Sequence, residues 1–184
     1  MTAEPADSSG SGRERHLGAP AIVEIDPAVY RNVLGHLPTG VTVVSGSTAG
    51  RPVGLTVGSF FSVSLAPPLV GFCVARSSTT WNVIAEQQAF GVSVLADDQD
   101  ATSGRFASRV EDKFDGISWE PAPVTGSPLI HSAVAHLDCE IFDVFPAGDH
   151  DVVIGRVLAL EVHRAEAGAL VFARGGYHRH ESID

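Results

Sequence analysis

The chain has 184 residues, which is enough for one domain with its own hydrophobic core. Its 12 Lys and Arg residues stand against 22 Asp and Glu, and the formal net charge of -10 argues against a nucleic-acid backbone as partner. The 19 Gly and 11 Pro residues favour short strands joined by turns over a helical bundle.

The start of the chain carries no apolar pattern. Residues 1–22 are rich in Ser, Gly, Ala and charge, which predicts a flexible tail, and residues 23–184 are expected to form the folded domain. The tail lacks the apolar segment of a secretory signal, and no run reaches the roughly 18 apolar residues that span a bilayer. Cys73 and Cys139 lie in apolar runs without a metal-binding spacing, which is typical of buried thiols in a reducing compartment. These features predict a soluble, cytoplasmic protein.

A helix is expected from Asp26 to about residue 38. Asp26 is suited to the N-cap and Pro27 to the first helical position, while Val29, Val33 and Leu37 recur at i, i+4 and i+8. From residue 40 the apolar period changes to two, which predicts strands in 40–46 and 51–65 with a hairpin turn at 47–51. Residues 67–75 are almost continuously apolar, as in a strand that is covered on both faces.

The rest of the chain continues in mostly antiparallel order. A helix is predicted at 78–88, a strand at 89–96 and a polar helix at 98–106. Residues 132–145 and 150–163 should form a long antiparallel hairpin. Its apolar faces are expected to consist of Ala133, Ala135, Leu137, Cys139 and Ile141 on one strand, and of Val152, Ile154, Leu158, Leu160 and Val162 on the other. With a last strand in 169–177, this predicts a mainly β fold, a closed or half-open antiparallel barrel with two or three helices.

Three segments carry polar groups suited to ligand binding. In Gly54–Pro68, glycines at 54 and 58 allow close approach to the backbone, beside the hydroxyls of Thr56, Ser59, Ser62 and Ser64. Neutral hydroxyls and exposed N–H groups can hold a phosphate. The alternative is a strand pair with ordinary surface Ser and Thr residues.

The second segment, Ala75–Trp81, closes an apolar strand and opens a helix. Helix N-termini present backbone N–H groups and the positive end of the dipole to an anion, and Arg76 adds a local positive charge. Alternatively, Ser78 or Thr79 is simply the N-cap, although capping and anion binding are compatible.

The third segment is Phe145–Gly155, where Gly148 and Asp149 predict a tight turn before His150. His150 is either an ordinary turn residue or a ligand-facing one. The other seven histidines show no HxxxH or Cys/His spacing, and no metal site is predicted. The sequence also lacks the nucleophile elbow, the Walker A loop and the Rossmann glycine fingerprint.

Taken in order, six segments carry a family pattern. They are LPTGVTVVSG, GLTVGSFFSVSLAPPLVGFCVARSSTTW, FGVSVLADDQ, GRFASRVEDKFDGI, AHLDCEIFDVFPAGDHDVVIGRV and LVFARGGYH. Together they resemble the flavin reductase-like, FMN-binding split-barrel proteins, the reductase components of two-component flavin-dependent monooxygenases. The resemblance spans roughly residues 26–178.

This resemblance implies a homodimeric, Greek-key-like split β-barrel that binds FMN or FAD without a covalent link. It implies an NAD(P)H-dependent flavin reductase, in which NADH or NADPH reduces the flavin by hydride transfer and the reduced flavin leaves for a separate oxygenase. Two alternatives stay open. One is a flavin-binding protein that retains FMN without fast turnover, and the other is a split-barrel oxidase that acts on its own substrate.

The resemblance also implies site residues. His150 is expected at the nicotinamide face of the flavin as the catalytic candidate. The expected cofactor-binding residues are Thr56, Val57, Gly58, Ser59, Ser62, Ser64, Ser78, Thr79, Thr80, Arg105, Phe106, Lys113 and Tyr177. One departure matters: where the family usually has T-A-S-S-F, this chain has Val57-Gly58-Ser59-Phe60 after Thr56. Phosphate anchoring is therefore expected to depend more on Ser78 and Thr80.

Overall fold

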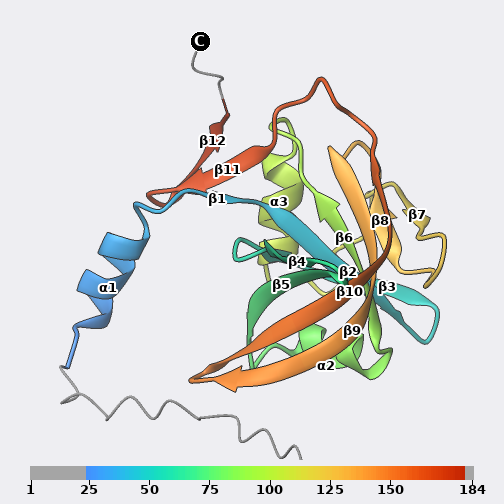
Figure 1. The fold of residues 1–184 in the computed structure, drawn as a ribbon. Coiled ribbons are helices and arrows are strands. Elements are labelled where there is room, and N and C mark those ends of the chain that lie inside the picture. The colour runs from blue at the N-terminus through green and yellow to red at the C-terminus, as the bar shows by residue number, and fades with distance from the viewer. Residues whose placement is uncertain (1–23, 181–184) are drawn as a thin grey trace, which may run out of the picture.

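The computed structural model describes residues 24–180, which contain three α-helices and twelve strands (Figure 1). The predicted tail at 1–22 lies outside the described residues. The helices are α1 (Pro27–Leu34), α2 (Thr79–Glu86) and α3 (Asp100–Ala107). The strands are β1 (Thr39–Gly40), β2 (Thr42–Thr48), β3 (Arg51–Val57), β4 (Phe61–Leu65), β5 (Pro68–Ala75), β6 (Ala89–Val94), β7 (Trp119–Pro121), β8 (Pro128–Ile130), β9 (Ala135–Ala147), β10 (His150–Val162), β11 (Leu170–Ala173) and β12 (Gly176–Arg179).

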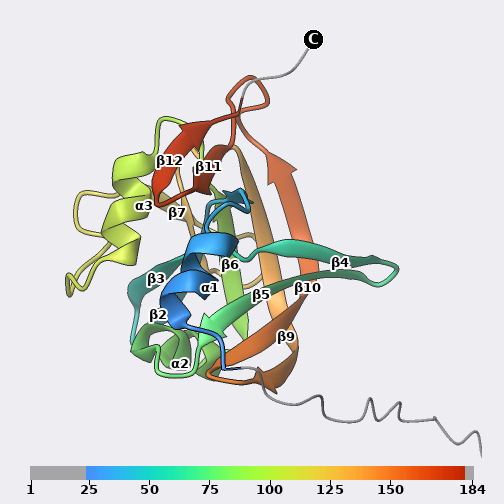
Figure 2. The same cartoon turned by 90° about the vertical axis from the view of Figure 1, so that its left-hand side faces the viewer.

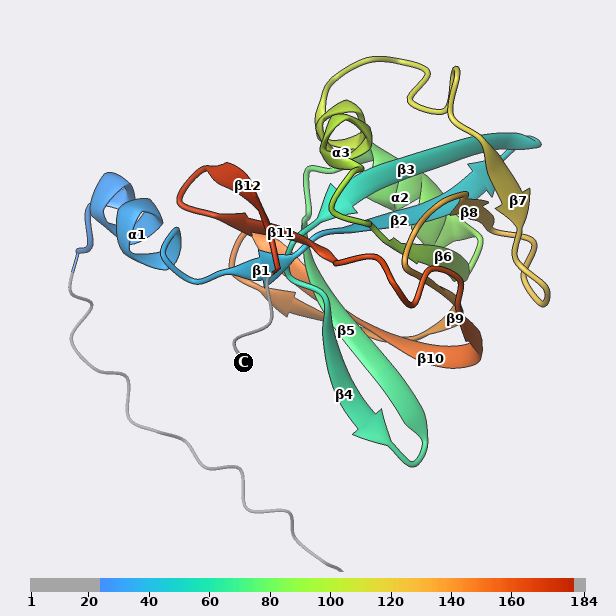
Figure 3. The same ribbon diagram turned by 90° about the horizontal axis from the view of Figure 1, so that it is seen from above.

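One curved sheet organises the molecule. Its seven strands run in the order β3-β2-β6-β9-β10-β5-β4, and each neighbouring pair is antiparallel. Two smaller sheets, β1-β11-β12 and β7-β8, flank it (Figures 1 and 3). The mainly β prediction is confirmed. Within residues 24–180 the edge strands β3 and β4 do not pair with each other, so this sheet is not a closed barrel.

The core is centred on three aromatic rings. Phe72 from β5, Trp81 from α2 and Phe90 from β6 meet edge to face, with ring centroids 5.3 to 6.5 Å apart. This geometry is favoured by the ring quadrupoles. Trp81 is 2% exposed and belongs to the core cluster, so its burial anchors α2, which lies against β2, β3 and β6. Cys139 is fully buried beside these rings, and burial raises the pKa of its thiol to about 12.

The long hairpin β9–β10 is confirmed, with Gly148 and Asp149 at its turn. Two irregularities interrupt its register, at Ile154/Gly155 and at Val157/Ala159. They shift the alternation of side chains between the two faces. The predicted apolar face of β10 is wrong, because Val153 from the opposite face joins the core with Phe72 and Phe90. Val152 and Ile154 are only partly buried, and Leu158, Leu160 and Val162 are 38%, 68% and 60% exposed.

Two further segments differ from the sequence-based expectation. Residues 51–65 form two strands, because the chain leaves the sheet at 58–60 and returns as the edge strand β4, which projects from the body with β5 (Figures 2 and 3). Helix α1 begins as predicted, with Asp26 Oδ1 accepting a hydrogen bond from the Ala28 N–H, but it ends at Leu34 and buries no residue. Its apolar residues Val29 and Val33 stay exposed, as does Leu37 after it. No helix in residues 24–180 is long and apolar enough to cross a membrane.

Candidate functional site

A cavity of about 330 Å³ lies where β3, α3 and the β11–β12 hairpin meet. We call it the hydroxyl cavity. Alternation along β3 turns the Val57 side chain into the core, where it is 4% exposed, and turns Thr56 towards the cavity. Three residues predicted from the sequence, Thr56, Gly58 and Tyr177, therefore line the same cavity. The lining consists of Val41, Thr56, Gly58, Ser103, Ala107, Phe172 and Tyr177.

Two hydrogen bonds connect Thr56, Ser103 and Tyr177 in this cavity. Thr56 Oγ1 donates to the Ser103 carbonyl at 2.7 Å, and Ser103 Oγ lies 2.8 Å from the Tyr177 hydroxyl oxygen. In the Ser103–Tyr177 pair one hydroxyl donates to the other, so the acceptor's own proton remains available for a ligand. The pair also offers lone pairs as acceptors. The hydroxyl cavity thus provides a donor and acceptors close to two aromatic rings, Phe172 and Tyr177.

Ser103 was not among the residues predicted from the sequence. It lies in α3 three residues before Phe106, so both residues lie on the face of the helix that meets the core. A fully buried Ser beside a buried Phe on a polar helix is the signal that singles it out.

A second cavity, of about 430 Å³, lies between the start of α2 and the segment that follows α3. We call it the cationic cavity. Thr79 and Thr80 from the first turn of α2 line it together with Arg109 and Lys113, opposite one carboxylate, Glu111. Lys113 Nζ donates to the Phe106 carbonyl at 2.8 Å, and burial lowers the pKa of Lys113. Two cations beside a helix N-terminus suit an anionic group such as a phosphate.

Ser78, Arg105 and Phe106 support this region structurally. Ser78 Oγ accepts a hydrogen bond from the Trp81 N–H at 3.2 Å and is the N-cap of α2. Arg105 donates to the carbonyls of Asp112 and Lys113, both at 2.8 Å, and so fixes the loop that carries Lys113. The Phe106 ring is 1% exposed and packs against Phe114 in the core.

His150 begins β10 and lies beside the turn that precedes α2. It pairs with Ala75, and the Arg76 N–H donates to the Asp149 carbonyl at 3.1 Å. His150 Nδ1 lies 2.7 Å from Asp149 Oδ1, and this hydrogen bond lowers the pKa of Asp149. The imidazole is about half exposed, and it lines neither of the two cavities.

The remaining predicted residues lie apart from both cavities. Ser59 Oγ accepts from the Cys73 N–H at 2.9 Å and donates to the Cys73 carbonyl at 3.1 Å, which ties the segment after β3 to β5. Ser62 and Ser64 lie on the projecting strand β4. The structure thus groups Thr56, Gly58 and Tyr177 in the hydroxyl cavity. It groups Thr79, Thr80 and Lys113 in the cationic cavity.

The hydroxyl cavity therefore offers hydroxyls and aromatic rings, and the cationic cavity offers two cations. The chain matches the model of the flavin reductase like domain over residues 34–181 and belongs to this family.

Individual relatives show the same relationship. The chain is 49% identical to a flavin reductase of Pseudomonas putida over 154 residues, which cover 83% of this chain and 89% of the relative. It is 45% identical to the flavin-dependent monooxygenase reductase subunit HsaB of Rhodococcus jostii, over 87% of this chain and 81% of the relative. A solved structure of the Streptomyces globisporus NADH:FAD oxidoreductase SgcE6, in complex with NAD and FAD fragments, superposes with a TM-score of 0.80 at 36% identity. That match covers 87% of this chain and 98% of the other.

The cationic cavity gives a prediction for Thr80→Ala. If the Thr80 hydroxyl contacts a flavin phosphate, this change weakens FMN binding about fivefold through the loss of one hydrogen bond and leaves riboflavin binding unchanged. Flavin fluorescence quenching measures both affinities. Ser77→Ala, in the exposed turn just before the helix, is the matched control. Equal losses for FMN and riboflavin would place Thr80 away from the phosphate.

Proposed function

We propose that this protein is an NADH-dependent flavin reductase that supplies reduced flavin to a separate monooxygenase. The family match over residues 34–181 carries this proposal. The named relatives are a flavin reductase, a monooxygenase reductase subunit and an NADH:FAD oxidoreductase. They favour a reductase over a protein that merely retains FMN and over an oxidase that acts on its own substrate.

The residues present fit FMN or FAD. The hydroxyl cavity offers the Ser103–Tyr177 hydroxyl pair and two aromatic rings to the polar and flat parts of a flavin ring. The cationic cavity offers Arg109, Lys113 and the first turn of α2 to a phosphate. When bound, the flavin accepts the hydride from the nicotinamide, and this chemistry belongs to the cofactor.

Within this proposal the chain's own residues position the flavin. The Thr56 hydroxyl holds Ser103 by donating to the Ser103 carbonyl, and the Ser103 hydroxyl orients the Tyr177 hydroxyl. We assign Lys113, Thr79 and Thr80 to the phosphate side. Asp149 fixes one imidazole nitrogen of His150, which leaves Nε2 as the nitrogen that faces away from this partner. For Ser62 and Ser64 the role implied by the resemblance stays a prediction.

We further propose a homodimer in which two curved sheets form a split β-barrel. Large apolar side chains that one chain leaves exposed support it. Tyr30 and Val33 on α1 are 55% and 59% exposed, and Leu65 on β4 is 92% exposed. Exposed apolar side chains of this kind mark an interaction surface. We place the protein in the cytoplasm because Cys73 and Cys139 are both free thiols.

Light scattering coupled to gel filtration tests the dimer. We expect twice the mass of one chain for the wild type and a shift towards monomer for Val33→Asp, because a charge on α1 opposes burial of that face. Val124→Asp, at an equally exposed apolar residue beside β8, should keep the dimer. A wild-type mass of one chain at micromolar concentration would contradict the proposal.

Steady-state consumption of NADH tests the activity. We expect NADH oxidation that depends on added FMN or FAD and saturates in both the nicotinamide and the flavin. The absorbance of NADH measures the rate, and omission of flavin is the control. If the protein binds flavin but does not oxidise NADH when either flavin is added, the proposal of a flavin reductase is refuted.

His150→Ala tests the nicotinamide side. We expect the Km for NADH to rise about threefold to tenfold, which corresponds to one lost hydrogen bond, while the Kd for flavin changes little. Asp143→Ala, at an exposed position on the same hairpin, is the control. A large loss of flavin affinity with an unchanged Km for NADH would move His150 to the flavin side.

A further inference from the structure

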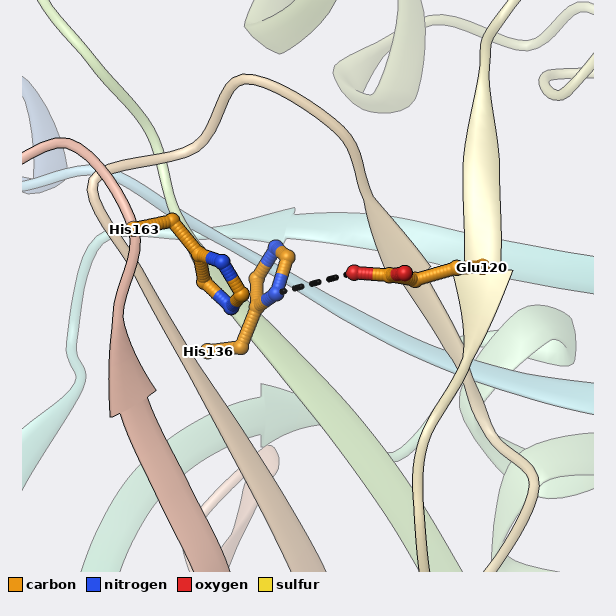
Figure 4. A group of neighbouring side chains, drawn as sticks. All are labelled: Glu120, His136 and His163. Atoms are coloured by element: carbon orange, nitrogen blue, oxygen red, sulfur yellow. Dashed lines mark ion pairs between the residues drawn. The ribbon is translucent and has the colours of Figure 1, made fainter.

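A group of potential metal ligands lies outside both cavities. Glu120 on β7, His136 on β9 and His163, which follows β10, place one ligand atom each within 4.8 Å of the others (Figure 4). The rings of His136 and His163 lie with their centroids 4.3 Å apart. The three side chains line a cavity of about 290 Å³, together with Leu129, Asp138 and Glu161.

His136 is the fixed member of this group. Its side chain is 5% exposed, and its Nε2 lies 2.8 Å from the Ile130 carbonyl oxygen. A carbonyl only accepts hydrogen bonds, so Nε2 carries the proton and Nδ1 carries a free lone pair. This tautomer is the one in which a histidine binds a metal through Nδ1 while a backbone carbonyl orients the ring.

The lone pair of His136 has no partner among the described residues. Nδ1 is buried without a hydrogen bond, and it points towards Glu120 (Figure 4). The nearest carboxylate oxygen, Glu120 Oε1, is 3.9 Å away, which is too far for a hydrogen bond. Two acceptors thus face each other, and one of them, His136 Nδ1, is buried. Buried acceptors normally have a partner, so the geometry suits a group that accepts an electron pair from His136 Nδ1 and from the half-exposed Glu120 carboxylate.

The charges around these two acceptors favour a cation. Glu120 and Glu161 add two carboxylates to the two imidazoles that line the cavity. Asp138 also lines it, but the Val124 and Thr125 backbone N–H groups and the Thr125 hydroxyl already donate to its carboxylate. Asp138 is therefore a structural residue and is not needed as a ligand.

We propose that Glu120, His136 and His163 bind one Zn²⁺ ion, through the Glu120 carboxylate, His136 Nδ1 and the His163 imidazole. Two imidazoles and a carboxylate form a donor set that zinc commonly takes, with a water molecule as the fourth ligand. In a tetrahedral zinc site neighbouring ligand atoms lie about 3.4 Å apart, so the group must contract by roughly 1 Å. Glu120 is about half exposed and His163 is exposed, so both can move towards the buried His136.

A third histidine lies near the carboxylate. His131 Nε2 is 3.8 Å from the other oxygen of Glu120, and Ser118 Oγ lies 2.9 Å from His131 Nδ1. The zinc would tie the short β7–β8 sheet to the ends of β9 and β10. It would lie roughly 40 Å along β10 from His150, so we assign it a role separate from flavin reduction.

Zinc binding to the untagged full-length chain tests the proposal. Metal-free protein is titrated with Zn²⁺ by calorimetry, and Co²⁺ serves as a spectroscopic substitute in the visible range. We expect one Zn²⁺ per chain with a Kd below about 10 µM, and Co²⁺ absorption bands typical of a tetrahedral site. Thermal unfolding should shift to higher temperature with Zn²⁺, because a ligand that binds the native state stabilises it.

Variants of the exposed ligands locate the ion. Glu120→Gln and His163→Ala should each weaken Zn²⁺ binding at least about tenfold, while the unfolding temperature of the metal-free protein stays close to that of the wild type. His36→Ala, at another exposed histidine, is the matched control and should bind like the wild type. These measurements need no flavin or NADH, so they stand or fall independently of the reductase activity.

Two results would overturn the proposal. Absence of binding at one ion per chain would mean that His136 Nδ1 meets only water. Undiminished affinity in both Glu120→Gln and His163→Ala would place the ion at other histidines.

Discussion

The contact on which the rest of the structure depends is the one between Phe90 and Gly155. Phe90 lies on β6, and a Cβ atom at residue 155 would overlap its ring. Glycine at this position lets β10 pass close over the core at the point where the strand register is interrupted. Trp81 packs on the same ring and thereby fixes the start of α2. One aromatic centre thus sets the curvature of the long hairpin and the position of the cationic cavity.

Local chemistry accounts for what the sequence predicted well. The Asp26 and Ser78 caps, and the turn at Gly148 and Asp149, are decided by neighbours within a few residues. Near neighbours do not decide the break between β3 and β4 or the exposure of Leu160. These features depend on bulges and on surfaces that one chain leaves uncovered. The candidate site divides in the same way. Thr79 and Thr80 follow from the helix start, whereas Ser103 meets Tyr177 across 74 residues of sequence only because α3 packs beside the β11–β12 hairpin.

The overall charge of the chain says little about its cavities. A formal charge of -10 coexists with a cavity in which Arg109 and Lys113 face a single carboxylate, Glu111. At about 0.15 M salt, charges farther than about 8 Å apart are largely screened, so the local pair outweighs the distant acidic residues. Arg105 contributes indirectly, since its guanidinium is used to hold the loop that carries Lys113. The proposed phosphate side therefore depends on a few placed cations in an acidic protein.

The same principle explains why spacing in the sequence did not indicate the zinc ligands. Residues 120, 136 and 163 come from three segments, and no short motif joins them. They meet because β7 pairs with β8, and because β9 and β10 run antiparallel, so that the start of β9 and the end of β10 lie together. The opposite end of this hairpin carries His150. A single pair of strands thus separates a buried imidazole whose Nδ1 has no hydrogen-bond partner among the described residues from a half-exposed imidazole held by Asp149, so the two histidines differ in environment.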